Sequence, residues 1–188
     1  TKVANLGQGA FQNCTAMETV GFYNKNMLGI KAMAFDSCIS IREVTMAYNT
    51  IMYIDSCAFH NCHNLTKITL PASISKSIGP SAFEGCTALD SVTALMETPQ
   101  AFGKDAFKNI SPTCVLTVPY GKKTAYIAAG WTEEVFKGGV RELIPAGINA
   151  VKADRKKSDI YYDLQGQRVT LPQKGKIYIH DGKKIRTE

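Results

Sequence analysis

Long apolar runs are missing from this sequence of 188 residues. A membrane-spanning helix needs roughly 18 or more consecutive apolar residues, and no stretch comes near that length. No charged and then apolar leader follows Thr1 either, so we expect the sequence to lie inside a longer parent whose signal peptide is not included. The sequence therefore predicts no membrane span.

Recognisable catalytic signatures are also missing. The sequence has 3 His residues, and none of them lies in a serine, cysteine or metal-hydrolase pattern. Gly7-Gln8-Gly9-Ala10 is not a phosphate loop, because the Lys-Ser/Thr pair that such a loop requires does not follow it. We expect no enzyme activity, no catalytic residues and no cofactor.

Acidic charge is scarce at the C-terminal end. Residues 147–188 hold 10 of the 22 Lys and Arg but 5 of the 16 acids, which accounts for +5 of the net charge of +6. Basic residues that cluster in this way usually form a solvent-exposed face with no specific partner. The alternative is that they attract an anionic surface. Because the helix or aromatic platform that reads bases is absent, we expect no nucleic-acid partner.

What the sequence does contain is a repeat of 24 residues. The dipeptide Ala-Phe recurs at this spacing, at Phe11, Phe35, Phe59, Phe83 and Phe107. Other positions keep the same frame. Apolar residues stand five positions before the Phe and six and nine positions after it, and cysteines stand three positions after the first four Phe. Such ladders are typical of a solenoid, in which stacked repeats share one continuous core.

Each repeat contains two kinds of local pattern. Alternation of apolar residues with Thr, as in Val44-Thr45-Met46, Ile68-Thr69-Leu70 and Leu116-Thr117-Val118, predicts a strand. The stretch Ala-Phe-x-x-Cys-x-x-Leu spaces its apolar groups by three, which predicts a short helical or 3-10 turn. We therefore expect one short strand and one short turn in each repeat.

These patterns predict an α/β solenoid, strand-rich with short helical or 3-10 turns, over residues 1–146. Five repeats reach about residue 119, and residues 120–146 form a cap in which a short helix between Gly121 and Gly130 lays Tyr126, Ile127 and Trp131 over the last repeat. Residues 147–188 are expected to form a small basic antiparallel β-module. Asp181-Gly182, between two alternating runs, has the chemistry of a two-residue hairpin turn.

The repeat resembles a known family. Residues 54–71, IDSCAFHNCHNLTKITLP, are similar to the BspA-type leucine-rich repeat, and five copies in phase carry the resemblance. The segment from Val118-Pro119 to Trp131 resembles the end of such proteins in Bacteroidetes. The tail, with YDLQGQRV at 162–169, KGKIYI at 174–179 and DGKKI at 181–185, is similar to a C-terminal module of secreted proteins from the same bacteria.

The resemblance implies a secreted or cell-surface protein that binds or adheres and does not catalyse. Its partner is expected to be an extracellular protein or glycan, such as host matrix. The alternative is a structural spacer whose C-terminal module serves export or surface anchoring. Self-association through the N-terminal end stays open.

Residues 57–63 contain two cysteines and two histidines, which are the usual ligands of zinc. However, Cys62 belongs to the apolar ladder and His60 and His63 fill positions held by other residue types elsewhere, so we expect no metal site. Cys14, Cys38, Cys62 and Cys86 are expected to pack as free thiols rather than as disulfides. The redox state of Cys57 and Cys114 stays open.

The strand face is the best candidate for a binding surface. Residues that alternate with the buried ones point away from the core, and solenoids commonly bind macromolecules on such extended surfaces. Thr is also a good strand former, so part of the Thr column has a structural explanation. The candidate binding residues are Glu43, Thr45, Lys67, Thr69, Ser91, Thr93 and Thr117.

Overall fold

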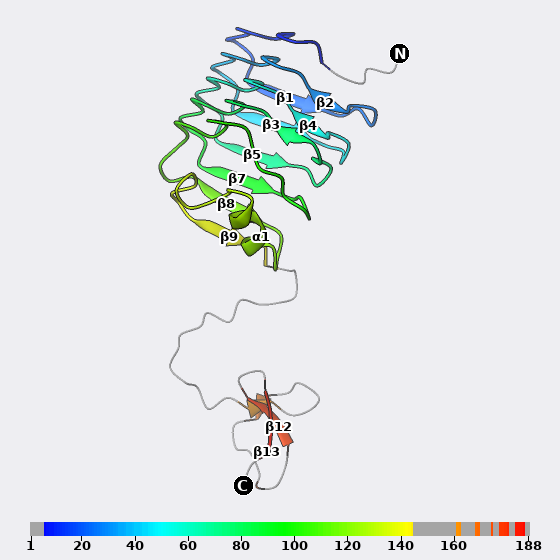
Figure 1. The fold of residues 1–188 in the computed structure, drawn as a ribbon, viewed down its shortest axis with the longest axis vertical. Coiled ribbons are helices and arrows are strands. Elements are labelled where there is room, and N and C mark those ends of the chain that lie inside the picture. Colours follow the sequence, from blue (N-terminus) through cyan, green and yellow to red (C-terminus); the bar gives the residue numbers. More distant parts are fainter. Residues whose placement is uncertain are drawn as a thin grey trace. The chain divides into compact units, whose positions relative to one another are not determined.

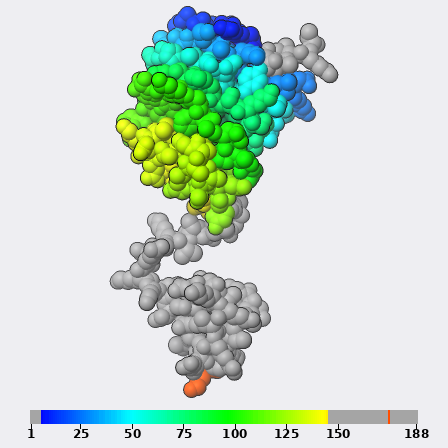
Figure 2. Space-filling view, viewed as in Figure 1, coloured from blue at the N-terminus to red at the C-terminus, as the bar shows by residue number. Residues whose placement is uncertain are grey.

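The computed structural model of this protein describes residues 6–144, Lys174 and the backbone of four short strands between residues 161 and 186. The chain divides into two compact units, Thr1–Pro145 and Ala146–Glu188. In the first unit the 24-residue repeats stack as successive coils that follow the chain from its N-terminal end to β8, β9 and α1 (Figure 1). The space-filling view shows the same order as adjoining bands of colour (Figure 2).

One parallel sheet runs the whole length of the stack. Alternating residues such as Ile68 and Leu70 are buried while Lys67 and Thr69 face outward, which is the pattern predicted for these strands. The register is in step with the repeat, so that Val44 pairs with Ile68. The six strands are, in order, β1 (Thr19–Phe22), β3 (Glu43–Met46), β5 (Lys67–Leu70), β7 (Ser91–Ala94), β8 (Val115–Val118) and β9 (Val140–Glu142).

A second, smaller parallel sheet follows the first within the coils. It consists of β2 (Gly29–Ile30), β4 (Tyr53–Ile54) and β6 (Ser77–Ile78), and its buried aliphatic residues are the ladder position five residues before each Phe. The prediction of one strand in each repeat is therefore wrong for the coils that contain these strands. Two residues are too few for alternation to reveal a strand in the sequence.

The third side of each coil is a turn, and we call the stack of these turns the turn column: residues 9–13, 33–37, 57–61, 81–85 and 105–109. In the third turn, Ala58 N–H donates to the carbonyl of Asp55 three residues back, and Phe59 N–H donates to Ala82 in the next repeat at 2.8 Å. The residues two before and two after each Phe have positive φ, between 54° and 76°. The predicted helical or 3-10 turn is therefore wrong. Apolar residues spaced by three also occur in tight turns, and here alternate N–H groups donate to the next repeat.

The first unit is consequently a strand-rich β-solenoid and not an α/β fold, since within residues 6–144 the one helix is α1 (Lys123–Ala128). Its core is continuous. The rings of the five repeat Phe residues stack nearly parallel, with centroids 5.2–5.4 Å apart and interplanar angles of 4–8°. Phe35, Phe59 and Phe83 lie in one hydrophobic cluster, which confirms the prediction of a shared core.

The cap buries three aromatic side chains, Tyr126, Trp131 and Phe136. The Tyr126 hydroxyl shares its hydrogen between the carbonyls of Ala94 and Met96, and Trp131 Nε1 donates to the carbonyl of Gln100 at 2.9 Å. Ile127 is 42% exposed, so its predicted place over the last repeat is wrong. Adjacent residues of a helix point about 100° apart, and Tyr126 holds the side that faces the core. The cap also adds β9 to the large sheet, which the sequence analysis missed.

In the second unit the structure describes four strands by their backbone alone: β10 (Tyr161–Tyr162), β11 (Arg168–Val169), β12 (Ile177–His180) and β13 (Lys183–Arg186). The pairs β10–β11, β10–β12 and β12–β13 are antiparallel, and His180 pairs with Lys183. The predicted turn residues Asp181 and Gly182 lie outside the described residues. The β-module as a domain stays a prediction.

Candidate binding surfaces

The outward side of the large sheet presents two straight columns of side chains. In one column Thr19, Glu43, Lys67, Ser91 and Val115 follow one another in register. In the next column, two residues along each strand, stand Gly21, Thr45, Thr69, Thr93, Thr117 and Arg141. Because paired strands lie about 4.8 Å apart, each column is a regular ladder of groups along the stack.

All seven residues predicted to bind lie in these two columns. Glu43, Lys67 and Thr69 are exposed, and the other four, Thr45, Ser91, Thr93 and Thr117, are partly exposed. Among the interactions of the described residues, none of these seven side chains forms a hydrogen bond or an ion pair. The structure thus brings the candidate residues together on one surface and leaves their polar groups available to a ligand.

Two shallow hollows adjoin on this surface near its N-terminal end. One, of about 280 Å³, is lined by residues 43–46 with Lys67 and Thr69. The other, of about 310 Å³, is lined by residues 19–21 with Tyr23, Glu43 and Thr45. Tyr23 is 69% exposed and its ring lies over Gly21, where a Cβ would collide with it.

Sequence reasoning missed Thr19, Tyr23 and Arg141 as members of this surface. Tyr23 stands just beyond the ladder positions, so the repeat says nothing about it; the signal was an aromatic residue in a segment that should be exposed. Arg141 was missed because the cap strand does not carry the repeat. Exposed Tyr side chains and Arg are enriched where proteins bind partners, so these residues extend the candidate surface at both ends.

A second polar row runs along the turn column, at the residue after each Phe. Gln12 Nε2 donates to Asp36 Oδ2 at 2.8 Å, and the Asp36 Oδ1 atom lies 2.8 Å from His60 Nδ1. Lys108 Nζ lies 3.6 Å from Glu84 Oε1. Burial of Asp36 opposes its ionisation, but hydrogen bonds from His60, Gln12 and Ser37 outweigh it and lower the pKa of this carboxyl. These side chains already satisfy one another, which favours a structural role.

The cysteines and histidines of residues 57–63 do not converge. His60 pairs with Asp36, while Cys62 is buried and donates its S–H to the Phe35 carbonyl, with Sγ and O 3.3 Å apart. Cys38 and Cys86 make the same contact with Phe11 and Phe59. Within the described residues no group of three or more His, Cys, Asp and Glu side chains is arranged to hold a metal ion.

All six cysteines, including Cys57 and Cys114, carry free thiols in the structure. Burial raises the pKa of the Cys62, Cys86 and Cys114 thiols, because the thiolate would lose its hydration. Cys14 and Cys57 are partly exposed. The four buried thiols therefore pack as core residues, and three of them, Cys38, Cys62 and Cys86, are also weak hydrogen-bond donors.

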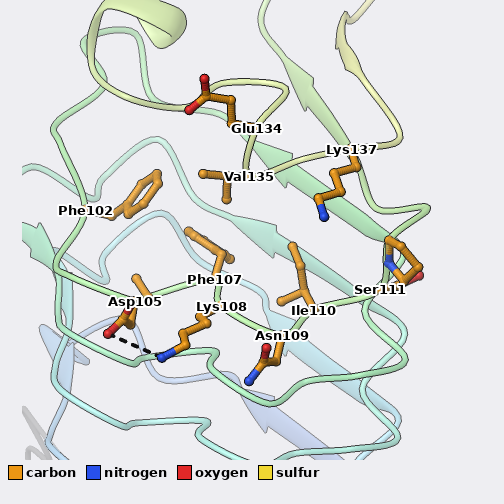
Figure 3. Close-up of a pocket in the computed structure, with 12 residues that line it drawn as sticks. Phe102, Asp105, Phe107, Lys108, Asn109, Ile110, Ser111, Glu134, Val135 and Lys137 are labelled. Carbon is orange, nitrogen blue, oxygen red and sulfur yellow. Dashed lines mark ion pairs between the residues drawn. The ribbon is translucent and has the colours of Figure 1, made fainter.

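A hollow of about 430 Å³, larger in volume than the two on the strand surface, lies at the C-terminal end of the turn column. Residues 105–112 of the last turn line one side, and Glu134, Val135 and Lys137 of the cap loop face them across the space (Figure 3). Asp105 and Lys108 form an ion pair of 3.8 Å at its edge. Sequence reasoning missed this site, because it depends on where the cap loop stands relative to the last turn.

Comparison with known proteins gives one match. The family model of the BspA type leucine rich repeat region matches six copies over residues 1–125. Neither a curated protein nor a solved structure matches the chain. In the described part of the chain, no helix has the length and apolar character that a membrane crossing requires.

Proposed function

Because the chain belongs to the BspA-type leucine-rich repeat family, we propose that it is a non-catalytic binding scaffold. In this proposal the outward side of the large sheet holds an extracellular protein or glycan, and the protein works at the cell surface or after secretion. The observation that carries the proposal is the pair of side-chain columns on one continuous sheet, whose seven predicted residues have no partner among the described residues.

The chemistry of this surface suits a large polar ligand. Thr hydroxyls both donate and accept hydrogen bonds, and they repeat along the stack in register. Glu43 and Lys67 add one charge of each sign in the neighbouring column. Tyr23 adds an exposed ring at one end, and aromatic rings supply contact area that is well suited to proteins and sugars.

Rigidity supports the same proposal. Each outward residue sits on a strand whose inward neighbours, such as Ile68 and Leu70, are buried in the shared core. A partner that binds several repeats at once therefore meets groups whose positions are already fixed, and it loses less entropy of ordering on binding.

A screen of extracellular matrix proteins and glycans with the whole chain tests the proposal. Thr69→Arg and Thr93→Arg place bulky cations in the centre of the Thr column, and we expect each to weaken retention of a ligand by about tenfold or more. Asn64→Arg is the matched control, because Asn64 is exposed in the same repeat as Thr69 but lies off the strands. A ligand held equally by all three variants would overturn the assignment of this surface.

A further inference from the structure

The turn column is held together by a repeated set of backbone hydrogen bonds. In each of the first four turns, three N–H groups donate to three carbonyls of the next repeat, which belong to its turn and to the residue just before that turn, at 2.8–3.0 Å. In the third turn the donors are Cys57, Phe59 and Asn61, and the acceptors are the carbonyls of Pro80, Ala82 and Glu84. Donors and acceptors are thus spaced two residues apart along each turn, and every internal turn uses both.

The fifth turn has the donors but no next turn. Its equivalent residues are Asp105, Phe107 and Asn109, and among the hydrogen bonds of the described residues their N–H groups donate none. The backbone keeps the conformation of the earlier turns, with φ of 58° at Asp105 and 57° at Asn109. The three N–H groups therefore point along the stack toward the place that a sixth turn would occupy.

That place is the hollow between the fifth turn and the cap loop (Figure 3). The cap fills only the ring position of a sixth turn, since Phe136 and Trp131 pack on Phe107 with centroids 5.1 and 5.6 Å away. It supplies no carbonyl to the three donors. Among the described residues the donors therefore have no protein acceptor, and the central one belongs to Phe107, a buried residue.

The walls of the hollow favour an uncharged occupant. Lys108 and Lys137 are balanced by Asp105 and Glu134, and Val135 offers an apolar contact. Because these charges cancel, a small anion would be attracted only weakly. A polypeptide backbone, in contrast, offers carbonyls at the spacing of the three donors. Three acceptors at every second residue span five residues, as they do in each internal turn.

We propose that this hollow binds a segment of a partner polypeptide that takes the turn conformation of the internal repeats, so that its alternate carbonyls accept from the N–H groups of Asp105, Phe107 and Asn109 and supply a sixth turn. The site is distinct from the strand surface and does not depend on it. In each internal turn the central acceptor carbonyl belongs to the Ala before the Phe, as at Ala82. This Ala is fully buried from Ala34 to Ala106, so the bound segment should carry a small residue at the same position.

The chain itself supplies a probe. A blocked heptapeptide with the sequence of residues 79–85 carries the three acceptor carbonyls of an internal turn, and Phe83→Ala in the peptide avoids the ring position that the cap fills. Titration into the whole chain, followed by amide NMR, should shift the signals of Asp105, Phe107 and Asn109 and slow their hydrogen exchange. The Phe59 amide, already bonded, should not change. The all-D peptide of the same sequence is the control.

Ser111→Trp fills the hollow and should weaken peptide binding by about tenfold or more, whereas Asn64→Trp adds the same ring elsewhere and should leave it unchanged. Thr69→Arg should also leave it unchanged, which separates this proposal from the strand surface. If Ser111→Trp does not fold, the exchange rates of the three wild-type amides still decide the matter.

The proposal is overturned if the three amides do not respond at the highest soluble peptide concentration, or if they respond equally to the all-D peptide. It is also overturned if inorganic phosphate alone gives the same response. A fourth such result is slower hydrogen exchange of the three amides when the protein concentration rises without peptide. The third result would assign the hollow to an anion, and the fourth to a second copy of the chain.

Discussion

At the C-terminal end of the solenoid the large sheet gains a sixth strand, β9, from the cap, whereas the turn column ends at its fifth turn with its donors unused. Both ladders belong to the same coils and share one core. The cap thus extends the hydrogen bonding of the large sheet by one strand, and it does not extend the hydrogen bonding of the turn column. The sheet side would therefore bind a partner through its outward side chains, whereas the open end of the turn column would bind one through backbone N–H groups.

The strongest way to break this comparison is to remove the packing of the cap on the C-terminal end of the core. Trp131 is 1% exposed and contacts the rings of Phe102, Phe107 and Phe136. We expect Trp131→Ala to lower the free energy of unfolding by about 3–5 kcal/mol, because it leaves a cavity and an unpaired Gln100 carbonyl. Urea denaturation measures the effect.

Ile127→Ala is the control for that prediction, since its side chain is 42% exposed on the same cap and should cost little. Equal losses in the two variants would mean that the cap acts as a loose appendage and that Trp131 does not cover the C-terminal end of the core.

The next effect concerns the approach of the cap to β8. A Cβ at Gly138 would collide with the carbonyls of Thr113 and Cys114, and Gly138 N–H donates to Cys114 at 2.9 Å. Gly138→Ala should therefore push β9 away from β8 and lower stability by about 1–3 kcal/mol. Gly7→Ala is the control, because nothing lies near its Cβ position. Fast amide exchange confined to residues 140–142 would identify the displaced strand, and unchanged exchange there would contradict the prediction.

How far the sequence predicts this architecture differs between the two sides of the coil. The alternation Ile68-Thr69-Leu70 identifies a strand and its outward column, because side chains of a half-buried strand have a period of two. The turn column was mistaken for helical turns. Its signal was present in the residues two after each Phe, Asn13, Ser37, Asn61, Gly85 and Asn109, since Asn and Gly are the residues that adopt positive φ most readily.

The candidate sites divide in the same way. The seven strand residues could be predicted because register and repeat coincide along the stack. The hollow at Asp105–Asn109 could not, because it arises from the absence of a sixth turn beside a cap that follows no repeat. β9 escaped prediction for the same reason.

A smaller effect tests whether the polar row on the turn column contributes to stability. The folded pKa of Asp36 lies below its ordinary value of 3.8, so its ionised form is stabilised by folding. That stability is present above the unfolded pKa and is lost as the pH falls through the folded pKa. Asp36→Asn should cost about 1 kcal/mol at neutral pH and should flatten the decline in stability below about pH 4.

Urea denaturation at pH values between about 5 and 2 checks this prediction against Glu43→Gln, which removes a carboxylate from the strand surface. Glu43 makes no ion pair among the described residues, so Glu43→Gln should leave the decline in stability at low pH unchanged. If stability declines with acid equally in the wild type and in Asp36→Asn, the row of Gln12, Asp36 and His60 does not stabilise the turn column.

The smallest expected effect is a gain in stability. Cys57 has φ of 55°, in a position that Gly9 fills in the first turn. A side chain in this left-handed conformation costs about 1–2 kcal/mol, and glycine avoids that cost but loses about 0.5–1 kcal/mol through the entropy of the unfolded chain. Cys57→Gly should therefore stabilise the solenoid by about 0.5 kcal/mol, whereas Cys57→Ala, which keeps the Cβ, should not. Since Cys57 is one of the donors along the stack, a loss of stability in Cys57→Gly would indicate that the side chain helps to direct its own N–H toward the carbonyl of Pro80.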